Sequence, residues 1–178
     1  MHYPKSSPDA YRSLVGLRAV RVFREEPLFD GDLEAVLEAA RWTGSSKNTQ
    51  PWAMVVVREG RERLAECGDF TGPVRAAPAV VVLVRRPGGG DFDIGRLAQN
   101  LMLGAAAVGV ASCPVTLHHE DRAREVLGVP SDHGCRYAVT LGYSDEERFV
   151  DQRRRAAGWL PQGRRPLAEL VFQERFGA

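Results

Sequence analysis

The sequence lacks an excess of charge of either sign, a paired set of cysteines and a long apolar run. Its 24 lysines and arginines nearly balance 23 aspartates and glutamates, for a formal net charge of +1, which argues against a nucleic-acid binder that acts through bulk charge. The three cysteines, Cys67, Cys113 and Cys135, are far apart and include no Cys-x-x-Cys pair. Neither a disulfide framework nor a zinc knuckle is therefore indicated, and a reducing compartment fits.

No apolar run approaches the roughly 20 residues that a membrane-spanning helix needs. The N-terminus is polar, with Lys5 and Asp9 where a signal peptide would need an apolar core. We therefore expect a soluble protein of the cytoplasm that does not bind membranes. With 178 residues, 44% of them hydrophobic, the chain is long enough for one core and only marginally for two. Residues 1–178 are expected to form a single domain.

The pattern of apolar and turn-forming residues predicts an α+β protein. Two short β-branched runs, 53–57 and 79–84, suit strands that are buried on both faces of a sheet. Small and apolar residues over 92–109 predict a long, central, buried helix. The other predicted elements are a helix capped by Ser7 that ends near 16–18, a helix from Asp30 or Asp32 to about Trp42, helices over 59–68 and 120–127, strands over 112–116 and 137–141, and an exposed loop over 85–91.

Two basic pairs could bind an anion. Arg18 and Arg21 follow the first helix, where positive charge favours the helix C-terminus for structural reasons alone. Arg164 and Arg165 lie near the C-terminus, where a solvated surface is the default explanation. Neither pair by itself decides between these interpretations.

A polar loop separates the second helix from the first strand. Its Ser45, Ser46, Asn48 and Gln50 could simply be turn formers that saturate their own backbone. Pro51-Trp52, however, fixes this loop rigidly, which is also what a binding site would need.

A stretch of small residues, Gly109 to Thr116, would let backbone amides approach a planar ligand closely, although it is more often a tight helix-to-strand turn. It contains Cys113, which could be considered as a nucleophile. His118 and His119 follow closely but could equally be exposed residues at a helix start. We therefore do not expect thiol catalysis.

Taken together and in this order, the motifs resemble those of the nitroreductase family of flavoproteins, over roughly residues 12 to 176. The most specific element is Ser-Ser-x-Asn-x-Gln-Pro-Trp, residues 45–52. The others are the basic pair at 18–21, Asp-x-Gly-x-x-x-x-Asn-Leu at 93–101, Gly-x-x-Ser-Cys-Pro at 109–114 and Arg-Arg-Pro-Leu-x-Glu-Leu at 164–170.

The resemblance implies a three-layer α-β-α fold with a central mixed sheet flanked by helices. It also implies a homodimer that binds one FMN at each end of its interface, with residues 160–178 as an extended arm on the partner subunit. Small molecules would be the other partners; no nucleic acid, membrane or metal is expected.

The resemblance also implies a set of flavin-binding residues and no catalytic side chain. The FMN phosphate would be held by Arg18, Arg21 and Arg164, with Arg165 beside it. The polar loop would face the flavin of the neighbouring subunit, and the backbone of residues 113–117 would lie along the edge of the flavin ring. The full set is Arg18, Ala19, Val20, Arg21, Ser45, Ser46, Asn48, Gln50, Cys113, Pro114, Val115, Thr116, Leu117, Arg164 and Arg165.

The implied activity is that of an oxidoreductase. A hydride from NAD(P)H would pass through flavin N5 to a nitroaromatic, quinone or related electrophilic acceptor by a ping-pong mechanism. The alternative is a dimer that sequesters or senses a flavin or deazaflavin without fast turnover. The first motif departs from the family's usual Arg-x-Ser-x-Arg/Lys, because Leu17 and Ala19 replace its first arginine and its serine. The remaining arginines are then expected to carry the phosphate.

Overall fold

The computed structural model describes residues 7–156 and 163–177, with side chains described for 7–151 and 163–177. The chain divides into two compact units, Met1–Asp145 and Glu146–Ala178. Within the described residues no helix is long and apolar enough to cross a membrane. The prediction of a single domain over the whole chain stays a prediction.

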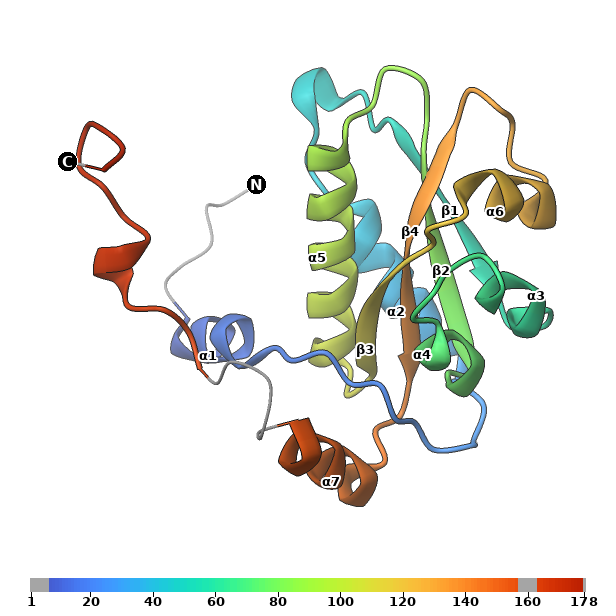
Figure 1. Cartoon of the computed structure of the whole chain (residues 1–178), viewed down its shortest axis with the longest axis horizontal. Helices are drawn as coiled ribbons and strands as arrows, with labels where there is room; N and C mark the ends of the chain where they lie inside the picture. The colour runs from blue at the N-terminus through green and yellow to red at the C-terminus, as the bar shows by residue number, and fades with distance from the viewer. Residues whose placement is uncertain (1–6, 157–162, 178) are drawn as a thin grey trace. The chain divides into compact units, whose positions relative to one another are not determined.

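The helices and strands follow one another in an α+β order (Figure 1). The first unit contains α1 (Pro8–Gly16), α2 (Asp30–Arg41), η1 (Ser46–Asn48), β1 (Trp52–Val57), α3 (Arg61–Ala65), α4 (Gly72–Ala76), β2 (Ala79–Arg85), α5 (Asp91–Ala107), β3 (Ala111–Thr116), α6 (Glu120–Leu127) and β4 (Gly134–Gly142). The second unit contains α7 (Glu146–Ala156) and η2 (Leu167–Glu169).

The sheet has four strands in the order β1-β2-β4-β3. Every described pair of neighbouring strands is antiparallel, so the expected mixed sheet is not what the described residues form. β2 and β3 do run in the same direction and are joined through α5, but β4 inserts between them and pairs with both. The insertion converts what would be one parallel pair into two antiparallel ones.

Two apolar cores lie on the two faces of this sheet. On one face, side chains such as Val81, Leu83 and Val139 pack under α2 and α5. On the other, Val80, Val82 and their neighbours pack under α3, α4 and α6. This alternation confirms that β2 is buried on both faces and that the fold has three layers, with α5 and α3 on opposite sides of the sheet (Figure 1).

α5 packs closely on α2 but buries only one stripe in this chain. A Cβ placed on Gly104 would lie 2.5 Å from the Cβ of Ala39, so the glycine permits the two helices to approach. Only Ile94, Leu97, Leu101 and Ala105 of this helix are fully buried. The predicted long helix is therefore present, but in the single chain the sheet and α2 bury one side of α5 only.

The predicted bounds hold at α1 and α2, but the predicted N-cap holds at α1 and not at α2, where Asp30 or Asp32 was expected to be the cap. Ser7 caps α1 by accepting a hydrogen bond from the backbone N–H of Ala10 at 3.2 Å. α2 instead has Phe29 at its N-cap, because Asp32 accepts a hydrogen bond from the Tyr143 hydroxyl at 2.6 Å and Asp30 pairs with Arg58. The helix expected over 59–68 shortens to α3, which begins after a left-handed glycine at residue 60.

The Cys135 thiol should make the free energy of unfolding depend on pH in the alkaline range. The thiol is fully buried, and burial, then the charge of Glu120, raises its pKa from 9.0 to about 11. Between these values the unfolded chain loses the thiol proton while the folded chain keeps it, so the free energy of unfolding falls as pH rises, by up to about 2–3 kcal/mol. Urea unfolding of the wild type and Cys135→Ala at pH 7, 9 and 10.5 should show the difference between them shifting against the wild type above pH 9. A difference that is constant with pH would contradict the assignment.

Candidate functional site

A pocket of about 430 Å³ opens where α5 begins and β3 ends. Its volume lies within the range of small-molecule sites. Three of the five residues predicted to follow the ligand, Pro114, Val115 and Thr116, line it. The other two, Cys113 and Leu117, do not line it, and their side chains are buried in the second core together with that of Val115, since alternate residues of a strand point to the same face.

The remaining walls of the pocket come from elements that the sequence did not assign to the site. They are Asp91, Ile94, Gly95 and Ala98 of α5 with Tyr137 and Ala138 of β4. Gly95 belongs to the Asp-x-Gly-x-x-x-x-Asn-Leu motif at 93–101, so that motif could have indicated its place in the site. Tyr137 and Ala138 belong to no motif that could have indicated theirs. The walls are mostly small or apolar, with a carboxylate, a hydroxyl and a phenol as polar groups, which suits a planar heteroaromatic ring such as that of FMN.

The segment that carries the first basic pair runs beside β3. The backbone N–H of Val20 donates to the Ser112 carbonyl at 2.9 Å, which sets Ala19 partly buried against the second core. Burial raises the pKa of the Cys113 thiol, and the positive charge of Arg21 partly offsets this rise. Arg21 therefore lies near the strand whose next residues line the pocket.

The two arginines of this segment have different partners. Arg18 donates to the carbonyls of Val15 and Leu17, both at 2.8 Å, so it satisfies the end of α1 as the structural interpretation predicted. Arg21 is exposed and makes no hydrogen bond or ion pair within the described residues. Of the two arginines, Arg21 is therefore the one whose guanidinium has no partner among the described residues and can bind an anion.

No acid–base partner stands beside the Cys113 thiol. Cys113 is 1% exposed, and the nearby histidines are engaged elsewhere: His118 and His119 lie 3.6 and 3.3 Å from the carboxylate of Asp69. A buried thiol with a raised pKa is a poor nucleophile. Within the part of the chain that the structure describes, no group of three or more metal-ligating side chains is assembled either.

The polar loop has an unusual backbone. Lys47, Asn48 and Gln50 have φ values of 50°, 55° and 47°. These values lie in the left-handed region of backbone conformation, which residues other than glycine rarely adopt. The Ser45 hydroxyl accepts from the Gln50 N–H at 2.8 Å, and the Gln50 amide donates to the Asn48 side chain at 3.2 Å. The loop thus saturates part of its own backbone, yet concentrated strain of this kind is typical of functional sites.

Both ends of the polar loop are anchored. Asn100 of α5 donates to the buried Thr43 hydroxyl at 3.0 Å, and Trp52 begins β1 with its side chain 8% exposed in the first core. Ser45 to Gln50 do not line the pocket. In one chain, therefore, the polar loop and the pocket lie on different sides of α5.

The C-terminal basic pair belongs to the second unit. Arg164 donates to the Gly163 carbonyl at 3.2 Å, and Arg165 pairs with Glu169 at 3.0 Å. Apolar side chains follow these arginines and remain open: Leu167 is 76% and Phe176 is 92% exposed. Of the expected arm over 160–178, residues 160–162 and 178 lie outside the described residues.

Comparisons of the sequence and of the structure with known proteins agree on one family. The model of the Nitroreductase family matches residues 15–85 and 72–143. The chain is 29% identical to an NADH dehydrogenase of Thermus thermophilus, covering 82% of this chain and 91% of that one. It is similar to the crystal structure of the FMN-dependent nitroreductase NfnB from Mycobacterium smegmatis in complex with NADPH, with a TM-score of 0.76, 26% identity and coverage of 94% and 99%. The NADPH:FMN oxidoreductase from Vibrio harveyi shares the fold, with a TM-score of 0.82, 19% identity and coverage of 96% and 79%.

Proposed function

This chain belongs to the nitroreductase family, and from that premise we propose that it is an FMN-dependent oxidoreductase that uses NAD(P)H to reduce nitroaromatic, quinone or related small electrophilic acceptors. The observation that carries the proposal is the pocket along Pro114–Thr116 with the free Arg21 beside the same strand. This juxtaposition offers a slot for a ring and a cation for a phosphate, without an assembled nucleophile or metal cluster in the described residues.

When bound, FMN would supply the redox chemistry: it would accept a hydride from the donor and, after the oxidised donor has left, pass it to the acceptor, as in a ping-pong mechanism. The residues of the chain bind the cofactor and orient it. The backbone of Pro114 to Thr116 would lie along one edge of the ring, and the small residues Gly95 and Ala98 would leave room for it on the α5 side of the pocket.

Arg21 holds the phosphate of FMN in this proposal. A guanidinium group suits a dianionic phosphate because it can donate two parallel hydrogen bonds. Arg18 contributes less than the motif alone implied, since the end of α1 already occupies it. Arg164, with Arg165 beside it, is the second phosphate ligand that we propose from the motif.

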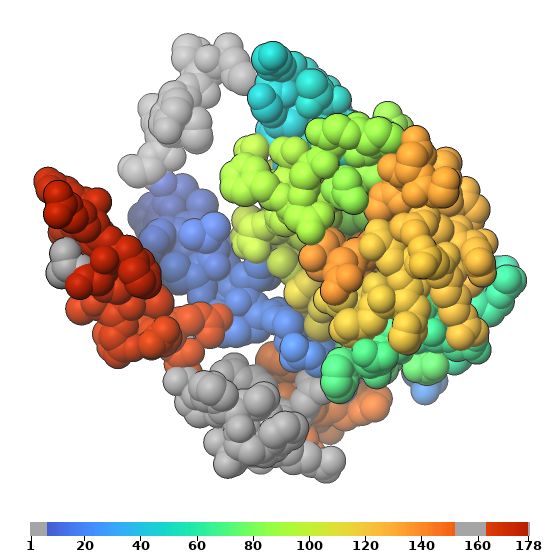
Figure 2. Space-filling view, turned by 45° about the horizontal axis from the view of Figure 1, so that its top comes forward, coloured from blue at the N-terminus to red at the C-terminus, as the bar shows by residue number. Residues whose placement is uncertain are grey.

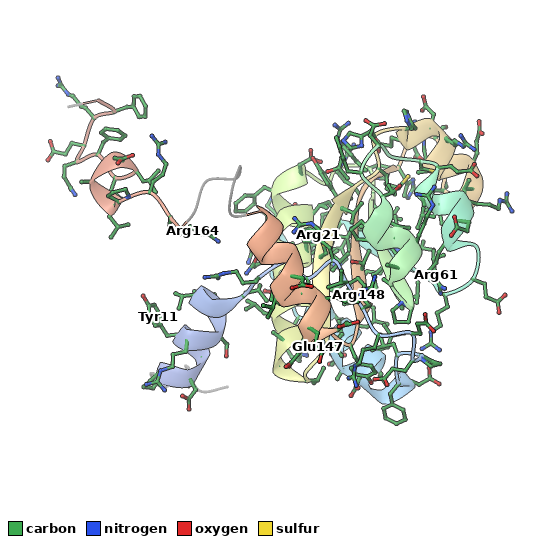
Figure 3. All side chains as sticks on the ribbon, turned by 60° about the horizontal axis from the view of Figure 1, so that its bottom comes forward. Tyr11, Arg21, Arg61, Glu147, Arg148 and Arg164 are labelled. Atoms are coloured by element: carbon green, nitrogen blue, oxygen red, sulfur yellow. The ribbon has the colours of Figure 1, made fainter. Side chains whose placement is uncertain are left out.

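We further propose that the protein acts as a homodimer. α1 leaves Tyr11 67%, Leu14 52% and Val15 51% exposed, and Tyr11 projects outward from it (Figure 3). β1 pairs only with β2 among the described strands, which leaves a sheet edge open. A second copy would cover these surfaces. The polar loop would then present Ser45, Ser46 and Asn48 to the flavin of the neighbouring subunit.

The decisive experiment is an anaerobic titration of the purified, FMN-loaded protein. Addition of NADH or NADPH should bleach the yellow flavin absorbance, and a nitroaromatic or quinone should restore it. Cys113→Ser should retain most of this turnover, because the buried thiol performs no step. A yellow protein that ignores both reagents would support the binding-only alternative, and loss of donor oxidation in yellow Cys113→Ser would contradict the mechanism.

Replacing Arg21 tests whether this residue binds the phosphate of FMN or its ring. Arg21→Ala should weaken FMN about tenfold or more, because a charged hydrogen bond contributes roughly 1.5–3 kcal/mol, and should change riboflavin affinity little. Fluorescence titration measures both constants. Arg63→Ala, an exposed arginine on α3, is the matched control. An equal loss for both flavins would show that Arg21 serves the fold or the ring instead.

The dimer proposal is tested by light scattering at micromolar concentration. The wild type should have twice the mass of the chain, and Leu14→Asp should shift it towards the monomer by placing a charge in the apolar contact. Phe70→Asp, at a position 83% exposed outside α1, is the control. A monomeric wild type that carries stoichiometric FMN would refute the dimer.

A further inference from the structure

Three cations and one aromatic ring gather around the polar loop and the beginning of α5. They are Lys47 in the loop, Arg86 after β2, and Phe92 and Arg96 on α5; together we term them the cationic rim. All four side chains are exposed. Figure 2 shows the loop and the segment that leads into α5 side by side on one face.

Contacts join these segments. The backbone N–H of Arg86 donates to the carbonyl of Pro51, at the end of the polar loop, at 3.0 Å. The guanidinium of Arg96 comes so close to Gly44 that a Cβ there would lie 3.0 Å from its Nη2. The same guanidinium lies 5.8 Å from the centroid of the Phe92 ring. The rim is therefore one surface, assembled from three segments of the chain.

The part of the chain that the structure describes provides no ion-pair partner for the cations of the rim. Within the described residues no carboxylate pairs with Lys47, Arg86 or Arg96, whereas the adjacent Arg85 lies 3.6 Å from Asp91. Several other surface arginines of the first unit do pair with acids, as Arg41 does with Glu38 and Arg75 with Glu62. Three unpaired cations on one surface favour the binding of an anion with more than one negative charge.

The rim lies on the polar-loop side of α5, so in the proposed homodimer it stands beside the partner subunit's flavin site, which this loop completes. Ile94 and Gly95 of α5 line the pocket, and Phe92 and Arg96 occupy the neighbouring positions on the same helical turns. Phe92, 79% exposed, offers a ring face, and Arg96 offers a guanidinium plane; both stack on purine bases. A ligand that joins an adenine to an additional phosphate would use every group of the rim.

We propose that the cationic rim binds the adenosine 2′-phosphate end of NADPH and makes the protein prefer NADPH to NADH. The inference rests on the proposed function, because it specifies the donor for that site. The adenine stacks on Phe92 and Arg96, and the 2′-phosphate is held by Lys47, Arg86 and Arg96. The nicotinamide end then reaches the flavin site that the polar loop completes. NADH lacks the phosphate and leaves the cations unpaired, so it binds less tightly.

The first test measures binding without turnover. Calorimetry on the FMN-loaded protein compares adenosine 2′,5′-bisphosphate with adenosine 5′-monophosphate and adenosine 5′-diphosphate. The 2′,5′-bisphosphate should bind at least tenfold more tightly than either 5′-nucleotide, which separates recognition of the 2′-phosphate from recognition of a 5′-phosphate group. Arg96→Gln and Lys47→Gln should each remove most of this preference. Phe92→Ala should weaken all three nucleotides alike.

The second test measures the donor preference. The ratio of kcat/KM for NADPH to that for NADH should exceed ten in the wild type and fall about tenfold in Arg96→Gln. Arg63→Gln, an exposed arginine remote in sequence on α3, is the matched control and should leave the ratio unchanged. Retention of the yellow spectrum in each variant shows that the flavin site is intact.

The outcomes separate the two proposals. Equal binding of the three nucleotides to the wild type, or an unchanged donor ratio in yellow Arg96→Gln, would overturn the cationic rim while leaving the oxidoreductase intact. A protein that binds no FMN or oxidises neither donor would contradict the proposed function. Tight binding of the 2′,5′-bisphosphate to that same protein, lost in Arg96→Gln, would still support the rim as a nucleotide site.

Discussion

The two central strands, β2 and β4, present apolar side chains to both faces of the sheet, and the other elements of the first unit are placed by the need to cover them. One face takes α2 and α5, and the other takes α3, α4 and α6. Since β4 lies between β2 and β3, α5 must cross the sheet to join those two strands. That crossing brings the beginning of α5 to the ends of β3 and β4, where the pocket forms.

α5 consequently serves two surfaces at once. Ile94, Gly95 and Ala98 form one wall of the pocket, while Arg96 and Asn100 contact the segment that begins the polar loop. One chain thus carries a ring slot and a strained polar loop that do not face each other. A homodimer in which each loop completes the partner's slot would unite them, and this is the physical reason that the proposed activity and the proposed assembly are linked.

Whether a cationic side chain already has a hydrogen-bond or ion-pair partner is a better guide to its role than its position in the sequence. A cation with a partner stabilises the fold, and a cation without one can bind a ligand. Arg18 is occupied by the carbonyls at the end of α1, and Arg41 by Glu38, whose pKa the hydrogen bond from Arg41 lowers to about 2. Arg21 and the cations of the rim have no such partner among the described residues. These four cations lie beside the pocket or the polar loop, where the proposed phosphate groups would bind. The histidines after β3 show the converse: Asp69 engages both.

The sequence by itself determined the local structure and the family. A serine cap, β-branched runs and an alanine-rich stripe predicted α1, β2 and α5 because each depends on neighbours in the chain, and the motif Ser-Ser-x-Asn-x-Gln-Pro-Trp carried the resemblance. Only the tertiary structure decided that the described strands all pair antiparallel, that Asp91 and Tyr137 line the pocket, and that Arg21 rather than Arg18 is free. These outcomes depend on which strands pair and which way side chains point across distant segments. Local periodicity is the same for either pairing order, so it carries no information about them.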